Sequence, residues 1–237
     1  MSTDNASVFK KEVLDKYLTE LAKEYRKLVG KSMPAEIVLV GGAAVIEGYG
    51  FRDMTTDVDA VISAASAMKD AIDRVGDRFD LPRGWLNADF RTTGSYSEKL
   101  IRYSAFYRTF CGVINVRVVT GEYLVAMKLR AFRQFKNDVS DVIGILAEHG
   151  KRGDAITLEH VEKAVAELYG SWDGFPAGAH EFITGAISGG DYESVYALVR
   201  QNERDARELL VDFDAAYPGA LNADNAAAVL KKLREKK

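Results

Sequence analysis

The sequence has little cysteine and histidine, and it has no long apolar run. A single cysteine, Cys111, cannot form an internal disulfide, and its place in "RTFCGVINV" predicts a buried core thiol at the start of a strand. The three histidines stand far apart, without the close pairs typical of a zinc site. No apolar run approaches the roughly 18–20 residues of a membrane span, and no signal-peptide core precedes the first helical pattern. We therefore expect a cytoplasmic protein with no membrane partner.

Charge is unevenly distributed along an otherwise ordinary globular composition. Hydrophobic residues make up 47% of the chain and charged residues 28%, a balance that excludes a disordered protein. The net charge is -3, yet residues 83–136 hold ten Lys or Arg against three Asp or Glu. A basic segment in an acidic protein indicates a site for a phosphate or a nucleic acid, and a solvated basic surface is the alternative.

Apolar spacing predicts an α+β fold, with a small mixed sheet flanked by helices in the first half and a helical second half. Short runs rich in apolar or β-branched residues predict strands at 36–40, 55–63, 104–110 and 112–120, the last two as a hairpin. Spacings of three and four predict helices at 8–29, 43–50, 65–79, 122–135, 138–150, 157–170, 191–217 and 222–237. The segments 122–135 and 138–150 form either two helices or one long helix with a polar middle. Gly30 is expected to end the first helix, Ser63 or Ser66 to cap the third, and residues 81–93 to form a loop.

Two aspartates, Asp57 and Asp59, stand two residues apart in a stretch that otherwise predicts a buried strand. Strand side chains alternate between faces, so both carboxylates point to the same side and repel each other. A divalent cation would relieve this repulsion, because Mg²⁺ binds one or two carboxylates together with the phosphate oxygens of a substrate. The alternative is an exposed strand end that carries two solvated aspartates.

A glycine pair, Gly41 and Gly42, directly follows the preceding predicted strand. Glycines at this position let backbone N–H groups approach a phosphate, and the next short helix would point its N-terminus at the same anion. The pair does not fit the G-x-G-x-x-G dinucleotide pattern, because no third glycine stands at the required position. A phosphate-binding turn and a metal-binding pair on successive strands would form one coherent site.

Two stretches resemble a known superfamily. "LVGGAAVIEGYGFRDMTTDVDAVI" is similar to the signature of nucleotidyltransferases related to DNA polymerase β, in which a glycine turn and a short helix precede an Asp-x-Asp strand. "YLVAMKLRAFRQFKNDVSDVIGIL" is similar to a downstream element of the small bacterial branch that includes the type IV abortive-infection toxins. The two matches cover roughly residues 37–62 and 123–146.

The resemblance implies roles for particular residues. Asp57 and Asp59 would bind Mg²⁺, Lys128 would contact phosphate or substrate, and Asp138 would complete the catalytic set. Nucleotide binding would involve Gly41, Gly42, Thr56, Arg117 and Arg133. The implied organisation is a nucleotidyltransferase-like core at 1–122 and a helical domain at 123–237 that contributes Lys128 and Asp138. For Lys128, the alternative is a solvated helix residue. Asp141 lies three residues after Asp138 and would face the same way on a helix, so a catalytic role is open to it as well; the alternative is a salt bridge or a charge at the helix terminus.

One expected feature is absent. Many members of the superfamily carry a third carboxylate on a later strand, and the equivalent strand here, "GVINVRVVT", has only Asn115 and Arg117 at its polar positions. Three explanations stay open: Asp138 substitutes, the enzyme uses one metal and a different base, or the site binds nucleotide without turnover. Arg117 would then pair with Asp57 or Asp59, or bind a γ-phosphate.

The expected function is Mg²⁺-dependent transfer of a nucleotidyl group from an NTP to RNA, protein or a small molecule such as an aminoglycoside. A toxin–antitoxin or phage-defence setting, with an antitoxin partner, would suit the branch. The rival is a catalytically silent nucleotide-binding or regulatory protein of the same fold. If the acceptor is RNA, the expected contacts combine basic and aromatic residues: Arg91, Tyr96, Lys99, Arg102, Tyr103, Phe106, Tyr107 and Arg108.

Overall fold

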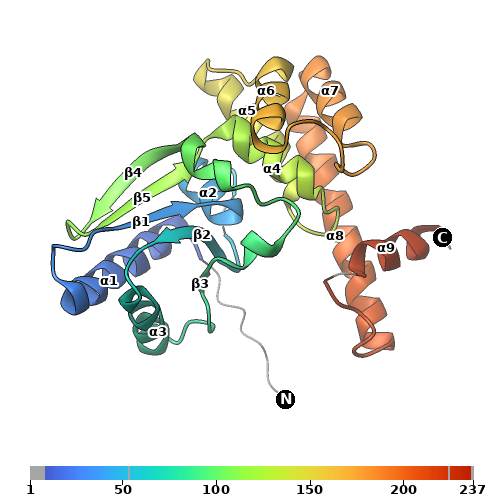
Figure 1. The fold of residues 1–237 in the computed structure, drawn as a ribbon. Helices are drawn as coiled ribbons and strands as arrows, with labels where there is room; N and C mark the ends of the chain where they lie inside the picture. The colour runs from blue at the N-terminus through green and yellow to red at the C-terminus, as the bar shows by residue number, and fades with distance from the viewer. Residues whose placement is uncertain (1–8, 53, 224, 236–237) are drawn as a thin grey trace. The chain divides into compact units, whose positions relative to one another are not determined.

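Figure 1 shows the fold as a computed structural model, which describes residues 9–52, 54–223 and 225–235. The chain divides into two compact units. The first comprises the chain up to Leu124 together with Ala164–Gly170, and the second comprises Val125–Lys163 and the chain from Ser171 onward. The domain boundary predicted after residue 122 stays a prediction.

Among the residues that the structure describes, the first unit contains a five-stranded mixed sheet. Its strands are β1 (Ala35–Leu39), β2 (Val58–Ser63), β3 (Leu86–Asn87), β4 (Ser104–Phe110) and β5 (Ile114–Val119). They lie in the order β3-β2-β1-β5-β4, with β1 antiparallel to β2 and parallel to β5. The central strand has no exposed side, as its continuous apolar run predicts. The predicted loop at 81–93 contains the short strand β3. Two residues are too few to show the alternating pattern from which a strand is predicted.

Three helices accompany this sheet: α1 (Lys11–Val29), α2 (Gly41–Gly48) and α3 (Ala67–Phe79). α1 and α3 pack against each other on one side of the sheet (Figure 1). The apolar stripe of α1 is buried, and Gly30 ends the helix with a φ of 72°, as predicted. Ser66 precedes α3, but its side chain makes no capping hydrogen bond. Two short 3-10 helices, Asp89–Thr92 and Glu98–Tyr103, lead into β4.

The predicted hairpin is confirmed, but Cys111 does not lie where it was expected. Both Cys111 and Gly112 have positive φ, 49° and 67°, and they form the turn between β4 and β5. Val113 N donates to the Phe110 backbone oxygen at 3.1 Å, so Cys111 and Gly112 are the central residues of a β-turn, and positive φ at both positions matches the right-handed twist of the strands. Cys111 is half-buried in this turn, so the prediction of a core thiol at the start of a strand was wrong.

A β-bulge in β4 directs two successive side chains to the same partner. The register between β4 and β5 shifts between Phe106 and Arg108. Successive residues of a regular strand point to opposite faces, and a bulge removes this constraint. The Tyr107 hydroxyl donates to Asp15 of α1 at 3.0 Å, and Arg108 Nη1 lies 3.1 Å from the same carboxylate. The bulge thereby fixes β4 to α1 through one acidic side chain.

The second half of the chain is helical, as predicted. Its described helices are α4 (Gly121–Ala131), α5 (Asp138–Arg152), α6 (Leu158–Tyr169), α7 (Ala179–Gly189), α8 (Tyr192–Ala216) and α9 (Ala226–Glu235). Sequence reasoning missed α7. Within the second unit, α5 packs against α8, and α8 packs against α9. None of the described helices has the length and apolar character needed to cross a membrane.

Side-chain hydrogen bonds stabilise the N-termini of α5 and α6. Glu203 of α8 is buried and accepts hydrogen bonds from the backbone N–H groups of Val139 and Ser140, both at 3.1 Å. It therefore satisfies two of the donors that a helix start leaves unpaired. At α6, Thr157 and His160 exchange reciprocal hydrogen bonds of 3.3 Å, so histidine fills the capping-box position usually held by Glu or Gln.

Candidate functional site

The glycine turn forms the first turn of α2. The helix begins at Gly41 itself, two residues earlier than predicted, and Gly41 has a φ of 56°. A positive φ strains residues with a side chain, so the chain needs glycine at this position. The first turn of a helix leaves backbone N–H groups without intrahelical partners, and these attract anions. The predicted phosphate-binding turn therefore has suitable donors.

Asp59 lies next to this turn, and Asp57 is linked to it through Thr55. Asp57 is exposed and precedes β2, whereas Asp59 is half-buried as the second residue of the strand. The Asp59 backbone oxygen accepts from Val40 N at 3.0 Å, which fixes Asp59 beside the residue before α2. A Cβ added to Gly41 would lie 3.4 Å from Asp59 Oδ2. The structure therefore brings a carboxylate of the pair against the glycine turn, although Asp57 itself stands just outside the strand.

Two residues that the sequence analysis did not select, Arg52 and Thr55, lie against Gly42. A Cβ on Gly42 would lie 2.5 Å from Thr55 Oγ1 and 2.9 Å from Arg52 Nη2. Thr55 is buried and donates from Oγ1 to Asp57 Oδ1 at 3.3 Å. The predicted nucleotide-binding Thr56 is exposed. The sequence could have pointed to Arg52, because it is a basic residue between the glycine pair and the aspartate pair.

We predict that Gly42→Ala destabilises the protein and weakens any anion binding at the α2 N-terminus. The new methyl group cannot fit 2.5 Å from Thr55 Oγ1, so Thr55 and Arg52 must move. Overpacking of this kind costs about 1–3 kcal/mol. Thermal unfolding measures the effect, and Gly48→Ala in the same helix is the matched control, because a Cβ there meets no atom within 4 Å. Equal melting temperatures for the two variants would contradict the close packing at Gly42.

The strand expected to carry a third acid has its polar side chains bound to β4. Pairing of Val38 with both Val61 and Arg117 places Arg117 on the same sheet face as Asp59. Arg117 Nε donates to Ser104 Oγ at 2.9 Å, and Nη2 donates to the Ser104 carbonyl oxygen. Asn115 Oδ1 accepts from Thr109 at 2.7 Å. These contacts show Arg117 held by Ser104, and not in the predicted pairing with Asp57 or Asp59; its role in nucleotide binding stays a prediction.

The residues beside the glycine turn suit a cation that takes most of its ligands from water and from the phosphates of a substrate. Among the described residues, no group of three or more His, Cys, Asp and Glu side chains could hold a metal ion. Two carboxylates beside a helix N-terminus instead suit Mg²⁺, which usually keeps several waters and binds the phosphates of a substrate. The donor set is therefore compatible with a substrate-bridged ion and not with a closed protein site.

The far end of α2 carries a buried acid. The Glu47 side chain is 0% exposed, and neither of its carboxylate oxygens has a hydrogen-bond partner. Lys11 Nζ lies 3.8 Å from Oε2 and donates to the Glu47 backbone oxygen at 2.9 Å. Burial raises the pKa of Glu47 above its ordinary value, and the Asp15 carboxylate adds to this, while the nearby Tyr107 hydroxyl, Lys11 and Arg108 oppose it.

We predict that Glu47→Gln stabilises the protein more at pH 8 than at pH 5. Because folding raises the pKa of Glu47, the folded state binds this proton more tightly than the unfolded chain does. That stabilisation is complete below the unfolded pKa and is lost as the pH rises through the folded pKa, whereas glutamine does not titrate. A gain on the order of 1 kcal/mol would raise the melting temperature by about 2–4 °C. The same gain at both pH values would contradict the prediction.

In the second unit, three buried side chains and one half-exposed arginine form an ion network. Lys128 Nζ lies 3.0 Å from Asp138 Oδ1 and 2.8 Å from Asp141 Oδ2, with all three side chains at most 7% exposed. Arg133 Nε lies 2.7 Å from Asp138 Oδ2. Burial alone would raise the pKa of Asp138, but Lys128 and Arg133 outweigh it and lower the pKa to about 2. The solvated alternative for Lys128 was wrong, and the salt-bridge alternative for Asp141 is confirmed.

The network accounts for the DVSDV pattern without reference to catalysis. Asp138 and Asp141 lie three residues apart on α5 and share the ammonium of Lys128. Asn137, just before α5, accepts from Arg200 Nη1 at 2.7 Å. These interactions hold the segment between α4 and α5 in place. The predicted catalytic roles of Lys128 and Asp138, and nucleotide binding by Arg133, stay predictions.

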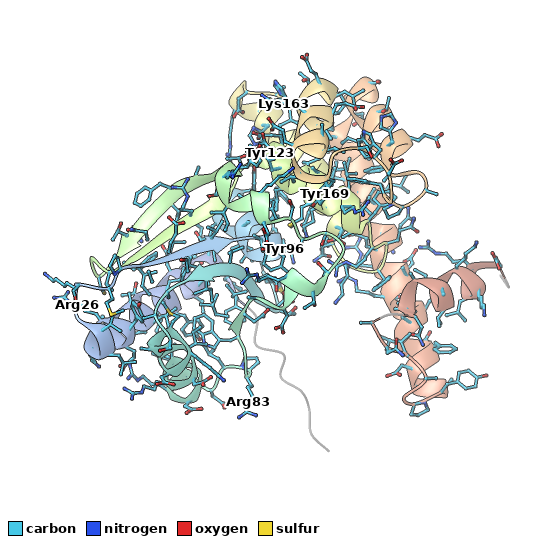
Figure 2. All side chains as sticks on the ribbon, viewed as in Figure 1. Arg26, Arg83, Tyr96, Tyr123, Lys163 and Tyr169 are labelled. Carbon is cyan, nitrogen blue, oxygen red and sulfur yellow. The ribbon has the colours of Figure 1, made fainter. Side chains whose placement is uncertain are left out.

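Most of the aromatic residues suggested as RNA contacts pack inside the first unit. Tyr103 stacks on Tyr123 with ring centroids 3.8 Å apart, and Tyr96 lies edge-on to Phe90. Figure 2 labels Tyr96 and Tyr123 among the side chains. Phe106, by contrast, is 61% exposed on β4. Of the suggested basic residues, Arg91, Lys99, Arg102 and Arg108 are all exposed. The RNA interpretation stays a prediction.

Comparison with known proteins places the chain in a family. No curated protein and no solved structure matches it significantly. A family model described as a nucleotidyltransferase of unknown function (DUF6036) matches residues 16–167, which include the glycine turn, the aspartate pair and Lys128. The match confirms the nucleotidyltransferase superfamily, while the abortive-infection branch stays a prediction. Because this match covers more than half of the chain, the protein belongs to that family of nucleotidyltransferases.

Proposed function

We propose that this protein transfers a nucleotidyl group from an NTP to an acceptor hydroxyl in a Mg²⁺-dependent reaction. The observation that carries the proposal is the position of Asp59 at the first turn of α2, where its Oδ2 lies 3.4 Å from the place of a Cβ on Gly41. Asp57 is linked to the same turn through Thr55, which lies against Gly42. A triphosphate bound by the α2 amides would have its phosphate oxygens beside both carboxylates. Family membership supports the same type of reaction.

In the proposed reaction, the acceptor oxygen attacks the α-phosphorus in line with the bond to the β-phosphate. The new O–P bond forms as the bond to the bridging oxygen breaks, pyrophosphate leaves, and the hydroxyl proton passes to a base. Mg²⁺, when bound, would neutralise charge on the triphosphate and on the leaving group. Asp57 and Asp59 would hold the ion, and the amides of Gly41 and Gly42 would orient the phosphates.

A second candidate is a protein that binds NTP without turnover. The described residues contain no third acid in a group with Asp57 and Asp59, and this observation favours the silent alternative. A site with two carboxylates can still neutralise a triphosphate. Binding and transfer must therefore be measured separately.

The test uses the full chain with each α-³²P-labelled NTP, Mg²⁺ or EDTA, and three acceptor classes: total RNA, total protein and aminoglycosides. The proposed activity predicts label in one acceptor class with Mg²⁺ and none with EDTA. Binding of an NTP without label in any class would replace the proposal with the silent alternative. Absence of both binding and label would overturn both candidates. The acceptor class that takes the label also bears on the biological role. Labelled RNA or protein would support a toxin–antitoxin or phage-defence role in the cytoplasm, and a labelled aminoglycoside would not.

A further inference from the structure

Arg52 occupies the space that Gly42 leaves empty. It belongs to the loop between α2 and β2, and its Nη2 and Cζ atoms lie 2.9 and 3.1 Å from the position of a Cβ on Gly42. The guanidinium therefore packs directly on the first turn of α2. Any anion that accepts hydrogen bonds from this turn would lie within reach of a permanent positive charge.

Two contacts with neighbouring residues of the loop help to hold the guanidinium in this position. Nε donates to the Met54 backbone oxygen at 2.9 Å, and Nη2 makes a long contact of 3.5 Å with Thr55 Oγ1. Thr55 Oγ1 in turn donates to Asp57 Oδ1 at 3.3 Å. This sequence of contacts links the cationic side of the glycine turn to the carboxylate pair. Phe9 fixes Thr55 further, because the two backbones exchange hydrogen bonds of 2.8 and 3.0 Å.

The charges around the turn complement the charges of an NTP. The carboxylates of Asp57 and Asp59 attract a divalent cation, and the Arg52 guanidinium and the α2 N-terminus attract oxygens of negative charge. An NTP with Mg²⁺ presents both, because the ion binds phosphate oxygens and leaves others to accept hydrogen bonds. Arginine suits the latter role better than lysine does, since its planar fork donates two parallel N–H groups to a phosphate.

We propose that Arg52 binds the β- and γ-phosphates of the NTP and stabilises the negative charge of the pyrophosphate as it leaves. This inference rests on the proposed function and adds a residue that selects triphosphates over nucleotides with fewer phosphates. Thr55 acts as a positioning residue, since its hydroxyl lies between the Arg52 guanidinium and Asp57.

The experiment measures affinity along a phosphate series. Titration calorimetry with Mg²⁺ first identifies which of ATP, GTP, CTP and UTP binds the full chain most tightly, and then compares its tri-, di- and monophosphate. Arg52→Ala should weaken triphosphate binding about 10- to 100-fold and leave monophosphate binding within about twofold. Arg52→Lys should recover part of the loss, because it restores the charge without the fork. Arg83→Ala is the matched control, since Arg83 is an exposed arginine of the same unit outside this site (Figure 2).

The outcomes separate this inference from the proposed function. If the wild type binds an NTP and Arg52→Ala keeps the full triphosphate preference, the Arg52 assignment is wrong while the proposed function stands. An equal loss for all three nucleotides would assign Arg52 a structural role only and overturn the inference. If the wild type binds none of the four NTPs, both proposals fail. Melting temperatures of the variants within about 2 °C of the wild type ensure that folding is not the cause.

Discussion

Asp59→Asn is expected to reduce nucleotidyl transfer by about 1000-fold or more while the fold is retained. The substitution keeps the shape of the side chain but removes the charge that lies against Gly41. Charge stabilisation of several kcal/mol at a phosphoryl group corresponds to at least three powers of ten in rate. The measurement is the initial rate of label transfer at saturating NTP, with the acceptor identified in the functional test.

Asp77→Asn is the matched control for this prediction. Asp77 is an exposed aspartate on α3, outside the proposed site, and its removal changes the net charge by the same amount. The control should transfer label at the wild-type rate. Asp59→Asn with more than a tenth of the wild-type rate would show that the pair does not hold a catalytic ion.

Lys128→Ala is expected to lower the free energy of unfolding by about 3–5 kcal/mol, since it leaves Asp138 and Asp141 with less positive charge in a buried environment. Arg133 still contacts Asp138, but its side chain is 46% exposed. Denaturant titration followed by circular dichroism measures the loss. Unfolding at the wild-type midpoint would contradict a stabilising role for the network.

A combined variant separates two effects of Lys128→Ala: the poorer neutralisation of the Asp138 and Asp141 charges, and the lost packing of the lysine side chain. Lys128→Met together with Asp138→Asn and Asp141→Asn removes all three buried charges and keeps most of the volume. Replacement of a buried ion group by neutral residues often restores stability, so this variant should recover a large part of the loss. If it folds stably and transfers label at the wild-type rate, the predicted catalytic roles of Lys128 and Asp138 are wrong. A stable but inactive variant would support those roles.

The fold was largely predictable because its elements carry local signals. The spacing of Leu14, Leu18 and Leu21 indicated α1, and the apolar run before Gly41 indicated the central strand. The hairpin followed from two β-branched runs around a short turn. Two elements escaped prediction for physical reasons. β3 has only two residues and depends on its pairing with Val58 and Asp59, and the sequence of α7, rich in Gly and Ala, shows weak amphipathic spacing.

The site was predictable only in part. The order of glycine turn, helix and Asp-x-Asp is a linear pattern, so Gly41, Gly42, Asp57 and Asp59 could be selected from it. The placement of Lys128 could not be read in the same way, because an exposed and a buried lysine fit the same helical spacing. Cys111 was assigned wrongly for a related reason: its apolar neighbours suggested burial, but the turn geometry decides its exposure.

By itself, the sequence determined the type and order of most elements, the glycine turn and the acidic pair, because periodicity and turn chemistry act over a few neighbouring residues. Only the tertiary structure decided which side chains surround that turn. Strand register and loop packing place Thr55 and Arg52 on Gly42 and tie Arg117 to Ser104. They also leave Glu47 buried without a hydrogen-bond partner. Such neighbours depend on contacts between distant segments, and no local pattern in the chain specifies them.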